Sequence, residues 1–190
     1  MTARPTRLLL ARHGETEWNR TGRFQGHADP PLSEIGREQA AALAERLAGN
    51  GIRAIYTSDL LRASETAQLV ATRLGLEVVE EAGLREIDVG SWSGLTRDEI
   101  ASSDPEGFER WLGGEIGHDG ETREQLTDRV VAAVERIAHA HAGVTVLVVS
   151  HGGAIRALRR HAAGDPGEVL ENCGTVTVDL VDGILTIDAA

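Results

Sequence analysis

Apolar residues gather in short runs along this chain, and polar or turn-forming residues separate the runs. The runs at residues 8–11 and 144–149 hold only apolar or β-branched side chains, which is typical of strands buried on both faces of a sheet. Near the end of the chain, Asp182-Gly183 between two further runs predicts a β-hairpin. The predicted strands cover residues 8–11, 52–57, 76–79, 144–149, 176–181 and 184–187.

Between the strands, apolar residues recur at the three- and four-residue spacing of amphipathic helices. Ser33 is the predicted N-cap of a helix that stops before Gly49, and Ser58 or Asp59 caps the next helix, which stops at Gly75. The other helices are predicted to begin at Thr96 with Glu99, at Asp104-Pro105, at Thr122 with Gln125, and at Ala154.

The polar segment at residues 15–32 interrupts this pattern directly after the first strand. It contains Gly22, Gly26, Pro30 and Pro31. The segment is too long for a plain turn and too rich in Gly, Pro, Asn and Asp for a helix. We therefore expect a functional loop that lies over the end of the first strand.

Strands and helices alternate along the chain, and a hairpin closes it. This order predicts an α/β fold, a three-layer α/β/α sandwich with a mostly parallel central sheet. Residues 1–190 are expected to form a single domain, with a small cap-like segment at about residues 91–121. Ligands of such sheets bind at the carboxyl ends of the strands, where His13 and His151 are predicted to lie.

The composition narrows the class of protein. A net charge of −11 argues against a nucleic-acid-binding protein, because such proteins present a basic face. Arg12, His13 and Glu15 interrupt the first apolar run before it could span a membrane or serve as a signal peptide. The single cysteine, Cys173, excludes an internal disulfide and is too few for a zinc or iron–sulfur site. We expect a cytoplasmic monomer or homodimer without nucleic-acid or membrane partners.

All 19 cationic residues are arginines, since the chain contains no lysine. The absence of lysine excludes a Schiff-base lysine and a phosphate-binding loop that depends on lysine. An anionic substrate must then be held by arginines, histidines, backbone amides and helix N-termini. The arginines closest in sequence to the predicted strand ends are Arg12, Arg20, Arg23 and Arg62.

Histidines and arginines together are predicted at one rim of the sheet, namely His13, His151, Arg12 and Arg62. Such a cationic pocket suits a phosphate dianion, because arginines pair with its oxygens in a bidentate geometry. A neutral imidazole can attack phosphorus once its other nitrogen donates to a fixed acceptor. The leaving alkoxide then needs a proton from a carboxyl group that the phosphate charge keeps protonated. Glu86 and Asp88 are the two candidates.

These residues lie in blocks that follow one another over nearly the whole chain. The blocks are Arg12-His13-Gly14-Glu15-Thr16, Trp18-Asn19-Arg20, Gly22-Arg23, Gln25-Gly26, Ser58-Asp59-Leu60-Leu61-Arg62-Ala63, Leu84-Arg85-Glu86, Gly120-Glu121-Thr122 and Val149-Ser150-His151-Gly152-Gly153. In this order they resemble the histidine phosphatase superfamily, or phosphoglycerate mutase-like family, in its cofactor-independent phosphatase branch. The resemblance implies a phosphoglycerate mutase-like fold and a phosphatase that hydrolyses a small-molecule phosphate monoester.

The resemblance also implies a role for individual residues. His13 would carry the phosphoryl group as phosphohistidine, and Arg12, Arg62 and His151 would surround that group. Glu86 would donate a proton to the leaving group and later activate water. The implied substrate-binding residues are Asn19, Arg23, Gln25, Gly26 and Gly152. The resemblance implies no metal ion and no cofactor. It implies that the protein binds a small-molecule phosphate ester or inorganic phosphate.

Two other functions stay open. A phosphoglycerate mutase would move phosphate between hydroxyls after priming by a bisphosphate, and mutases of the family tend to carry a longer insertion before the second histidine. This chain is short there, which favours hydrolysis. A non-catalytic module that binds phosphorylated ligands would lack the nucleophile or the acid, and both are present. Residues 18–29 and 91–121 are expected to set the physiological substrate.

A few further side chains have two interpretations. His27 and His118 lie on loops near the predicted pocket, where they either touch substrate or are simply exposed. The aromatic residues either form pocket walls or pack the cap segment onto the domain. They are Trp18, Phe24, Trp92 and Trp111.

Overall fold

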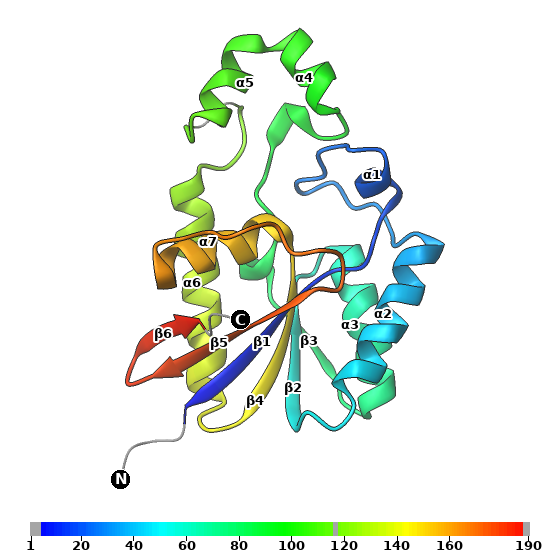
Figure 1. The fold of residues 1–190 in the computed structure, drawn as a ribbon, viewed down its shortest axis with the longest axis vertical. Helices are drawn as coiled ribbons and strands as arrows, with labels where there is room; N and C mark the ends of the chain where they lie inside the picture. Colours follow the sequence, from blue (N-terminus) through cyan, green and yellow to red (C-terminus); the bar gives the residue numbers. More distant parts are fainter. Residues whose placement is uncertain (1–4, 116–117, 188–190) are drawn as a thin grey trace.

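The computed structural model describes residues 5–115 and 118–187 and contains a six-stranded sheet (Figure 1). Its strands are β1 (Thr6–Arg12), β2 (Ile52–Thr57), β3 (Val78–Glu80), β4 (Thr145–Ser150), β5 (Thr175–Val181) and β6 (Ile184–Ile187). The strand order is β3-β2-β4-β1-β5-β6, in which β1 to β4 are parallel and β5 runs antiparallel to β1 and β6. The predicted mostly parallel sheet is confirmed, and the third strand begins two residues later than expected.

Helices cover both faces of the sheet (Figure 1). They are α1 (Glu17–Arg20), α2 (Glu34–Leu47), α3 (Leu61–Leu74), α4 (Arg97–Ser103), α5 (Pro105–Leu112), α6 (Arg123–Ala140) and α7 (Gly152–Ala163), with short 3₁₀ turns at Ala82–Leu84 and Gly90–Trp92. The pair α2 and α3 packs on one face, and α6 and α7 pack on the other. This is the predicted α/β/α sandwich.

The central strands β1 and β4 are apolar at residues 8–11 and 146–149 because both of their sides face a core. Leu8 and Leu10 belong to the core under α6 and α7, whereas Ala11 belongs to the core under α2 and α3. In β4, Val148 and Val149 divide between the two cores in the same way. Polar residues begin at the carboxyl ends of these two strands, with Arg12 after Ala11 and Ser150 after Val149.

The predicted capping boxes of α4 and α6 are confirmed, and Ser33 caps α2 by accepting from the Gly36 amide at 3.0 Å. The prediction that Ser58 or Asp59 caps α3 is wrong. Leu60 is the N-cap residue and has no side-chain cap bond. The first amide of the helix bonds instead to the polar segment at residues 15–32, because the Asp29 carboxylate accepts from the Leu61 amide at 2.6 Å. This bond ties the loop to the start of α3.

The expectation of a loop without helix at residues 15–32 is also wrong in part. The single turn α1 forms there, because Thr16 and Asn19 make a reciprocal capping box. The segment is fixed to the domain by close backbone approach as well. A Cβ atom on Gly14 would lie 2.5 Å from the carbonyl oxygen of Gly36, so glycine lets the start of α2 pack against the end of β1.

A small aromatic cluster lies apart from the two cores of the sandwich. Val89, Trp92 and Ile100 are buried in it, and Phe24 and Trp111 pack against them. In Figure 1 this region, with α4 and α5, stands above the carboxyl ends of the strands. None of the helices in the described ranges is both long and apolar enough to cross a membrane.

Candidate active site

The two motif histidines come from neighbouring parallel strands. Arg12 at the end of β1 is in register with Ser150 at the end of β4, and each strand is followed at once by a histidine. The ring centroids of His13 and His151 are 5.1 Å apart, and both side chains are buried. The sheet topology therefore brings together two residues that are far apart in sequence.

One nitrogen of His13 is held by the backbone. Nδ1 donates to the carbonyl oxygen of Gly14 at 2.6 Å, so the proton is on Nδ1 and the lone pair on Nε2. Burial, followed by the charges of Arg62 and Arg12, lowers the pKa of His13 well below its ordinary value. The imidazole is therefore neutral at physiological pH and has a free nucleophilic nitrogen.

His151 has the opposite arrangement. Its Nε2 lies 2.8 Å from the hydroxyl oxygen of Ser58, and that oxygen also lies 3.3 Å from the Leu60 amide. The Ser58 hydroxyl has a proton that it can donate to Nε2, and in that arrangement the His151 proton is on Nδ1. That Nδ1 is buried and has no hydrogen-bond partner in the described part of the chain. Burial and the neighbouring Arg62 lower the pKa of His151 well below its ordinary value.

Two arginines flank His13, and main-chain carbonyls hold both of them. Arg62 is 1% exposed and donates to the carbonyl oxygens of Ala28 at 2.8 Å and Gly26 at 2.9 Å. Arg12 donates to the carbonyl oxygen of Leu170 at 2.7 Å. The Nε atoms of both arginines are buried without a partner among the described residues. Burial lowers the pKa of Arg62 to about 10, so both guanidiniums keep their charge at neutral pH.

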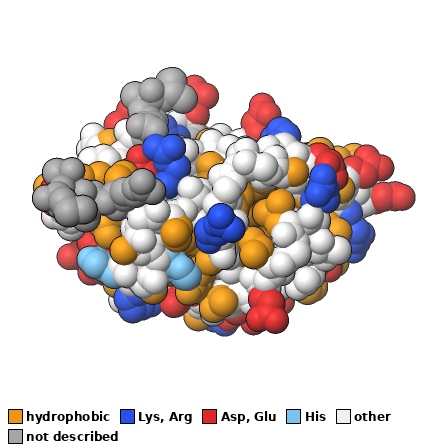
Figure 2. All heavy atoms as spheres, turned by 90° about the horizontal axis from the view of Figure 1, so that it is seen from below, with side chains coloured by type: hydrophobic (Ala, Val, Ile, Leu, Met, Phe, Trp, Pro, Cys, Tyr) orange, Lys and Arg blue, Asp and Glu red, His pale blue; other side chains and the backbone are white. Residues whose placement is uncertain are grey.

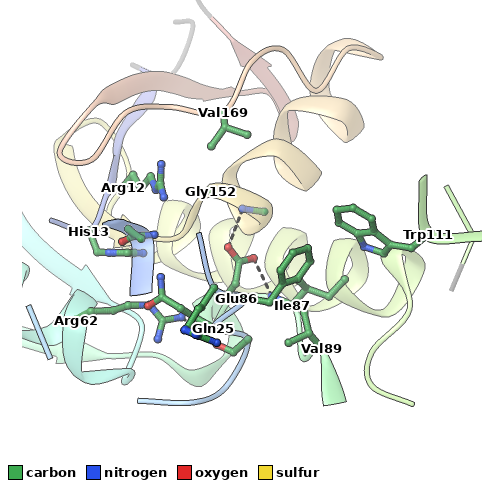
Figure 3. A pocket seen from close by; sticks show the side chains of 15 residues that line it. Arg12, His13, Gln25, Arg62, Glu86, Ile87, Val89, Trp111, Gly152 and Val169 are labelled. Carbon is green, nitrogen blue, oxygen red and sulfur yellow. Dashed lines mark hydrogen bonds between the residues drawn. The ribbon is translucent and has the colours of Figure 1, made fainter. Parts of the chain in front are cut away.

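Glu86 is the carboxyl group of the site. Its oxygens accept from the amides of Ile87 at 2.8 Å and Gly153 at 2.9 Å (Figure 3). A Cβ atom on Gly153 would lie 2.2 Å from this carboxylate, so only glycine allows the approach. The alternative acid, Asp88, lines a separate hollow with His27 and other residues.

These groups line a cavity of about 240 Å³ at the sheet rim. Figure 3 shows His13 between Arg12 and Arg62, with Glu86 across from them. Every predicted site residue except His151 lines this cavity, and His151 lies against the His13 ring. The lining residues are Arg12, His13, Asn19, Arg23, Phe24, Gln25, Gly26, Arg62, Glu86, Ile87, Val89, Trp111, Gly152, Gly153 and Val169. The arrangement can bind a phosphate dianion, attack it from a neutral nitrogen and protonate its leaving group.

A family model of the histidine phosphatase superfamily (branch 1) matches residues 8–185. The chain belongs to this superfamily. It is 43% identical over 193 residues to a metal-independent phosphoserine phosphatase of Arabidopsis thaliana, covering 97% of this chain and 80% of that protein. It is 41% identical over 157 residues to phosphoserine phosphatase 1 of Hydrogenobacter thermophilus, covering 80% and 74%. The solved mycobacterial glucosyl-3-phosphoglycerate phosphatase in complex with VO3 has a TM-score of 0.87 and 31% identity, covering 97% and 98%.

This histidine phosphatase is therefore a phosphoric monoester hydrolase of phosphoglycerate mutase-like fold. Among its described residues, no group of three His, Cys, Asp or Glu side chains is arranged to hold a metal ion. The cationic groups in its cavity are arginines that fixed carbonyls orient.

Several predicted binding residues of the phosphatase also hold the cavity wall together. The Asn19 Oδ1 accepts from the Thr16 amide at 3.1 Å, and the Gln25 Oε1 accepts from the Thr16 hydroxyl at 3.1 Å. Arg23 donates to the carbonyl oxygen of Gly94 at 2.6 Å and pairs with the Glu99 carboxylate at 3.0 Å. The loop after β1 is thus joined to residues 94–99, which lead into α4.

Phe24 and Trp111 fit both interpretations, because they line the cavity and also pack against the aromatic cluster. Trp92 is buried in that cluster and contacts the His118 ring at 5.1 Å, and neither Trp92 nor Trp18 is among the described residues that line the cavity. His118 thus packs in the cap. His27 contacts the loop after β3 that carries Glu86, since its Nε2 lies 2.9 Å from the carbonyl oxygen of Glu86.

The sequence did not predict three residues that shape this site. Ser58 looked like a helix cap but orients His151, and Gly153 admits the Glu86 carboxylate. Arg129 of α6 donates to the carbonyl oxygens of Arg85 and Glu86 at 2.7 Å each and so fixes the backbone on which Glu86 lies. An arginine inside an amphipathic helix carries no local signal for such a contact.

Proposed function

We propose that this phosphatase hydrolyses small-molecule phosphate monoesters by double displacement, with His13 as the residue that is phosphorylated. The observation that carries the proposal is the state of His13. Its pKa is lowered by burial and by two arginines, its Nδ1 is bonded to Gly14, and its Nε2 is left with a lone pair. A neutral imidazole held this way is ready to attack phosphorus.

In the first step, His13 Nε2 forms a bond to phosphorus while the bond from phosphorus to the ester oxygen breaks. Arg12, Arg62 and the Nδ1 proton of His151 bind the non-bridging oxygens and stabilise the charge of the transition state. The Glu86 carboxyl group, in its protonated form, gives its proton to the leaving oxygen. The alcohol leaves and His13 carries the phosphoryl group.

In the second step, the Glu86 carboxylate takes a proton from water, and the water oxygen attacks phosphorus. The bond between phosphorus and His13 Nε2 breaks, and inorganic phosphate is released. His13 returns to its neutral form and Glu86 to its protonated form, so the cycle closes. Asn19, Arg23, Gln25, Gly26 and Gly152 are proposed to complete the walls that orient the substrate.

The cap-like segment at about residues 91–121 is proposed to select the substrate, because its Trp111 lines the cavity. The whole chain is proposed to act as one domain in the cytoplasm, as a monomer or homodimer. Support for this location is the single cysteine, which a reducing compartment suits. Light scattering and cell fractionation test these two statements.

Labelling of the phosphoenzyme tests the mechanism. After brief mixing with a radiolabelled phosphate ester and denaturation, we expect acid-labile, base-stable label on a peptide that contains His13. The His13→Gln variant should show neither label nor turnover, whereas His139→Gln, which alters an exposed histidine of α6, should show both. Activity without label on His13, or turnover by His13→Gln, would refute the mechanism. Net transfer to a second hydroxyl instead of phosphate release would identify a mutase.

A further inference from the structure

A second hollow, of about 330 Å³, adjoins the active-site cavity. Ile87, Trp111 and Gly153 line both. Its remaining walls come from the end of α5 and from α6 and α7, as Leu112, Arg123, Leu126, Arg156, Ala157 and Arg160. We name this hollow the arginine groove.

The charged residues that line the arginine groove are all cations in the part of the chain that the structure describes. Arg123 donates to the carbonyl oxygen of Trp111 at 3.0 Å, and Arg156 donates to that of Gly167 at 3.2 Å. Neither of these residues, nor Arg160, forms an ion pair with any described carboxylate. Most of their donor groups are therefore free for another acceptor.

Three cations that share one groove with no carboxylate among its described residues repel one another, which costs stability. The net charge is −11, and several arginines outside the groove pair with carboxylates, as Arg129 does with Glu121 and Arg85 with Asp59. On the face opposite the cap, basic side chains are scattered among acidic and apolar ones (Figure 2). In the groove, Arg156 and Arg160 are one helical turn apart, where like charges repel. Burial, followed by the charges of Arg160 and Arg156, lowers the pKa of Arg123.

The position of the groove relative to Glu86 indicates which part of a substrate would reach it. Glu86 accepts from the amide of Gly153, and Gly153 and Ile87 line both spaces. Under the proposed mechanism Glu86 protonates the leaving oxygen, so the groove begins on the leaving-group side of the phosphorus. A group in the groove therefore belongs to the alcohol that is released.

We propose that the arginine groove binds a second anionic group on the alcohol portion of the substrate. The phosphatase would then act on phosphate monoesters that carry a carboxylate or a second phosphate, and Arg123, Arg156 and Arg160 would set this specificity. This inference rests on the proposed function, because it places the transferred phosphoryl group at His13.

Matched substrates test the groove. O-Phosphoserine and O-phosphoethanolamine differ by one carboxylate, and propanediol bisphosphate and monophosphate differ by one phosphate. Loss of a charge-assisted contact typically changes affinity by about ten- to a hundredfold, so we expect kcat/KM to favour the anionic member of one pair by at least about tenfold. The pair that shows the preference identifies the anion. No preference in either pair would overturn the proposal.

The double variant Arg156→Gln with Arg160→Gln should bring that preference close to one. The matched control is Arg159→Gln, which removes one charge from the same helix outside the groove and should keep the preference. Equal loss in the control, or a preference that persists in the double variant, would overturn the proposal.

Measurements of binding without turnover test the groove separately from the proposed mechanism. In a His13→Gln background, calorimetric Kd values for the same pairs should show the same dependence on Arg156 and Arg160, without turnover. If His13→Gln is fully active, the mechanism fails, and the kcat/KM ratios of the substrate pairs still test the groove. Thermal unfolding of each variant shows that it is folded, and a folded double variant with an unchanged Kd ratio would refute the groove.

Discussion

The two arginine clusters of this phosphatase are built in different ways. Arg62, in the active site, is 1% exposed, and two carbonyl oxygens fix its guanidinium. In the arginine groove, Arg156 makes one hydrogen bond of 3.2 Å and Arg160 is exposed. Groups that stabilise a transition state work best when they need no rearrangement, whereas groups that select a substrate can become ordered when it binds. The contrast is what we expect if the first cluster acts in the proposed catalysis and the second in the proposed choice of substrate.

The largest loss of activity should come from removing Arg62, the arginine that two carbonyl oxygens fix in the active site. Arg62→Met keeps the length of the side chain but removes its charge, and we expect kcat/KM for a simple aryl phosphate to fall about a thousandfold, which corresponds to about 4 kcal/mol. The control, Arg73→Met, removes an exposed arginine from the same helix and should stay within about twofold of the parent. A decrease of less than about tenfold for a folded Arg62→Met protein would contradict the phosphate site.

A second effect should depend on the leaving group. Glu86 lies between the two clusters, so Glu86→Gln removes the proton donor while leaving both sets of arginines in place. We expect kcat for an alkyl phosphate to fall about a hundredfold or more, in the range for loss of a general acid. For 4-nitrophenyl phosphate, whose leaving group needs no proton, the first step should be affected much less.

Burst kinetics check this assignment. With 4-nitrophenyl phosphate, Glu86→Gln should release nitrophenol in a burst followed by a slow steady rate, since the second step still needs a base. Asp88→Asn serves as the matched control, because Asp88 lines a different hollow. If Asp88→Asn shows the larger loss, the proton donor has been assigned to the wrong carboxylate.

The same contrast explains how much the sequence could predict. Arg12, His13 and His151 were predictable because each lies within two residues of the end of an apolar run, and parallel strands place such residues at one rim. Ser58 was misassigned because a serine before a helix is usually a cap, and only the β2 and β4 pairing brings it to His151. The residues predicted to bind substrate also line the cavity, namely Asn19, Arg23, Gln25, Gly26 and Gly152.

The arginine groove could not be predicted from sequence. Arg123 lies at the start of α6, and Arg156 and Arg160 lie on α7, 33 or more residues later in the chain. Each one has an ordinary solvent-facing pattern in its own helix. Their convergence depends on how α6 packs against α7, which is a property of the tertiary structure.

The smallest effect concerns the buried histidines and is measured on stability. The pKa of His13 is well below its ordinary value in the folded protein, whereas in the unfolded chain it is about 6.5. Below that pH the unfolded state binds a proton that the folded state does not bind, so the free energy of unfolding decreases as pH falls and recovers as pH rises. His13 should contribute up to about 1.4 kcal/mol per pH unit to this slope. Urea unfolding between pH 7.5 and 5 should therefore give a shallower slope for His13→Gln than for His139→Gln, and equal slopes would show that the pKa of His13 is not lowered in the folded protein.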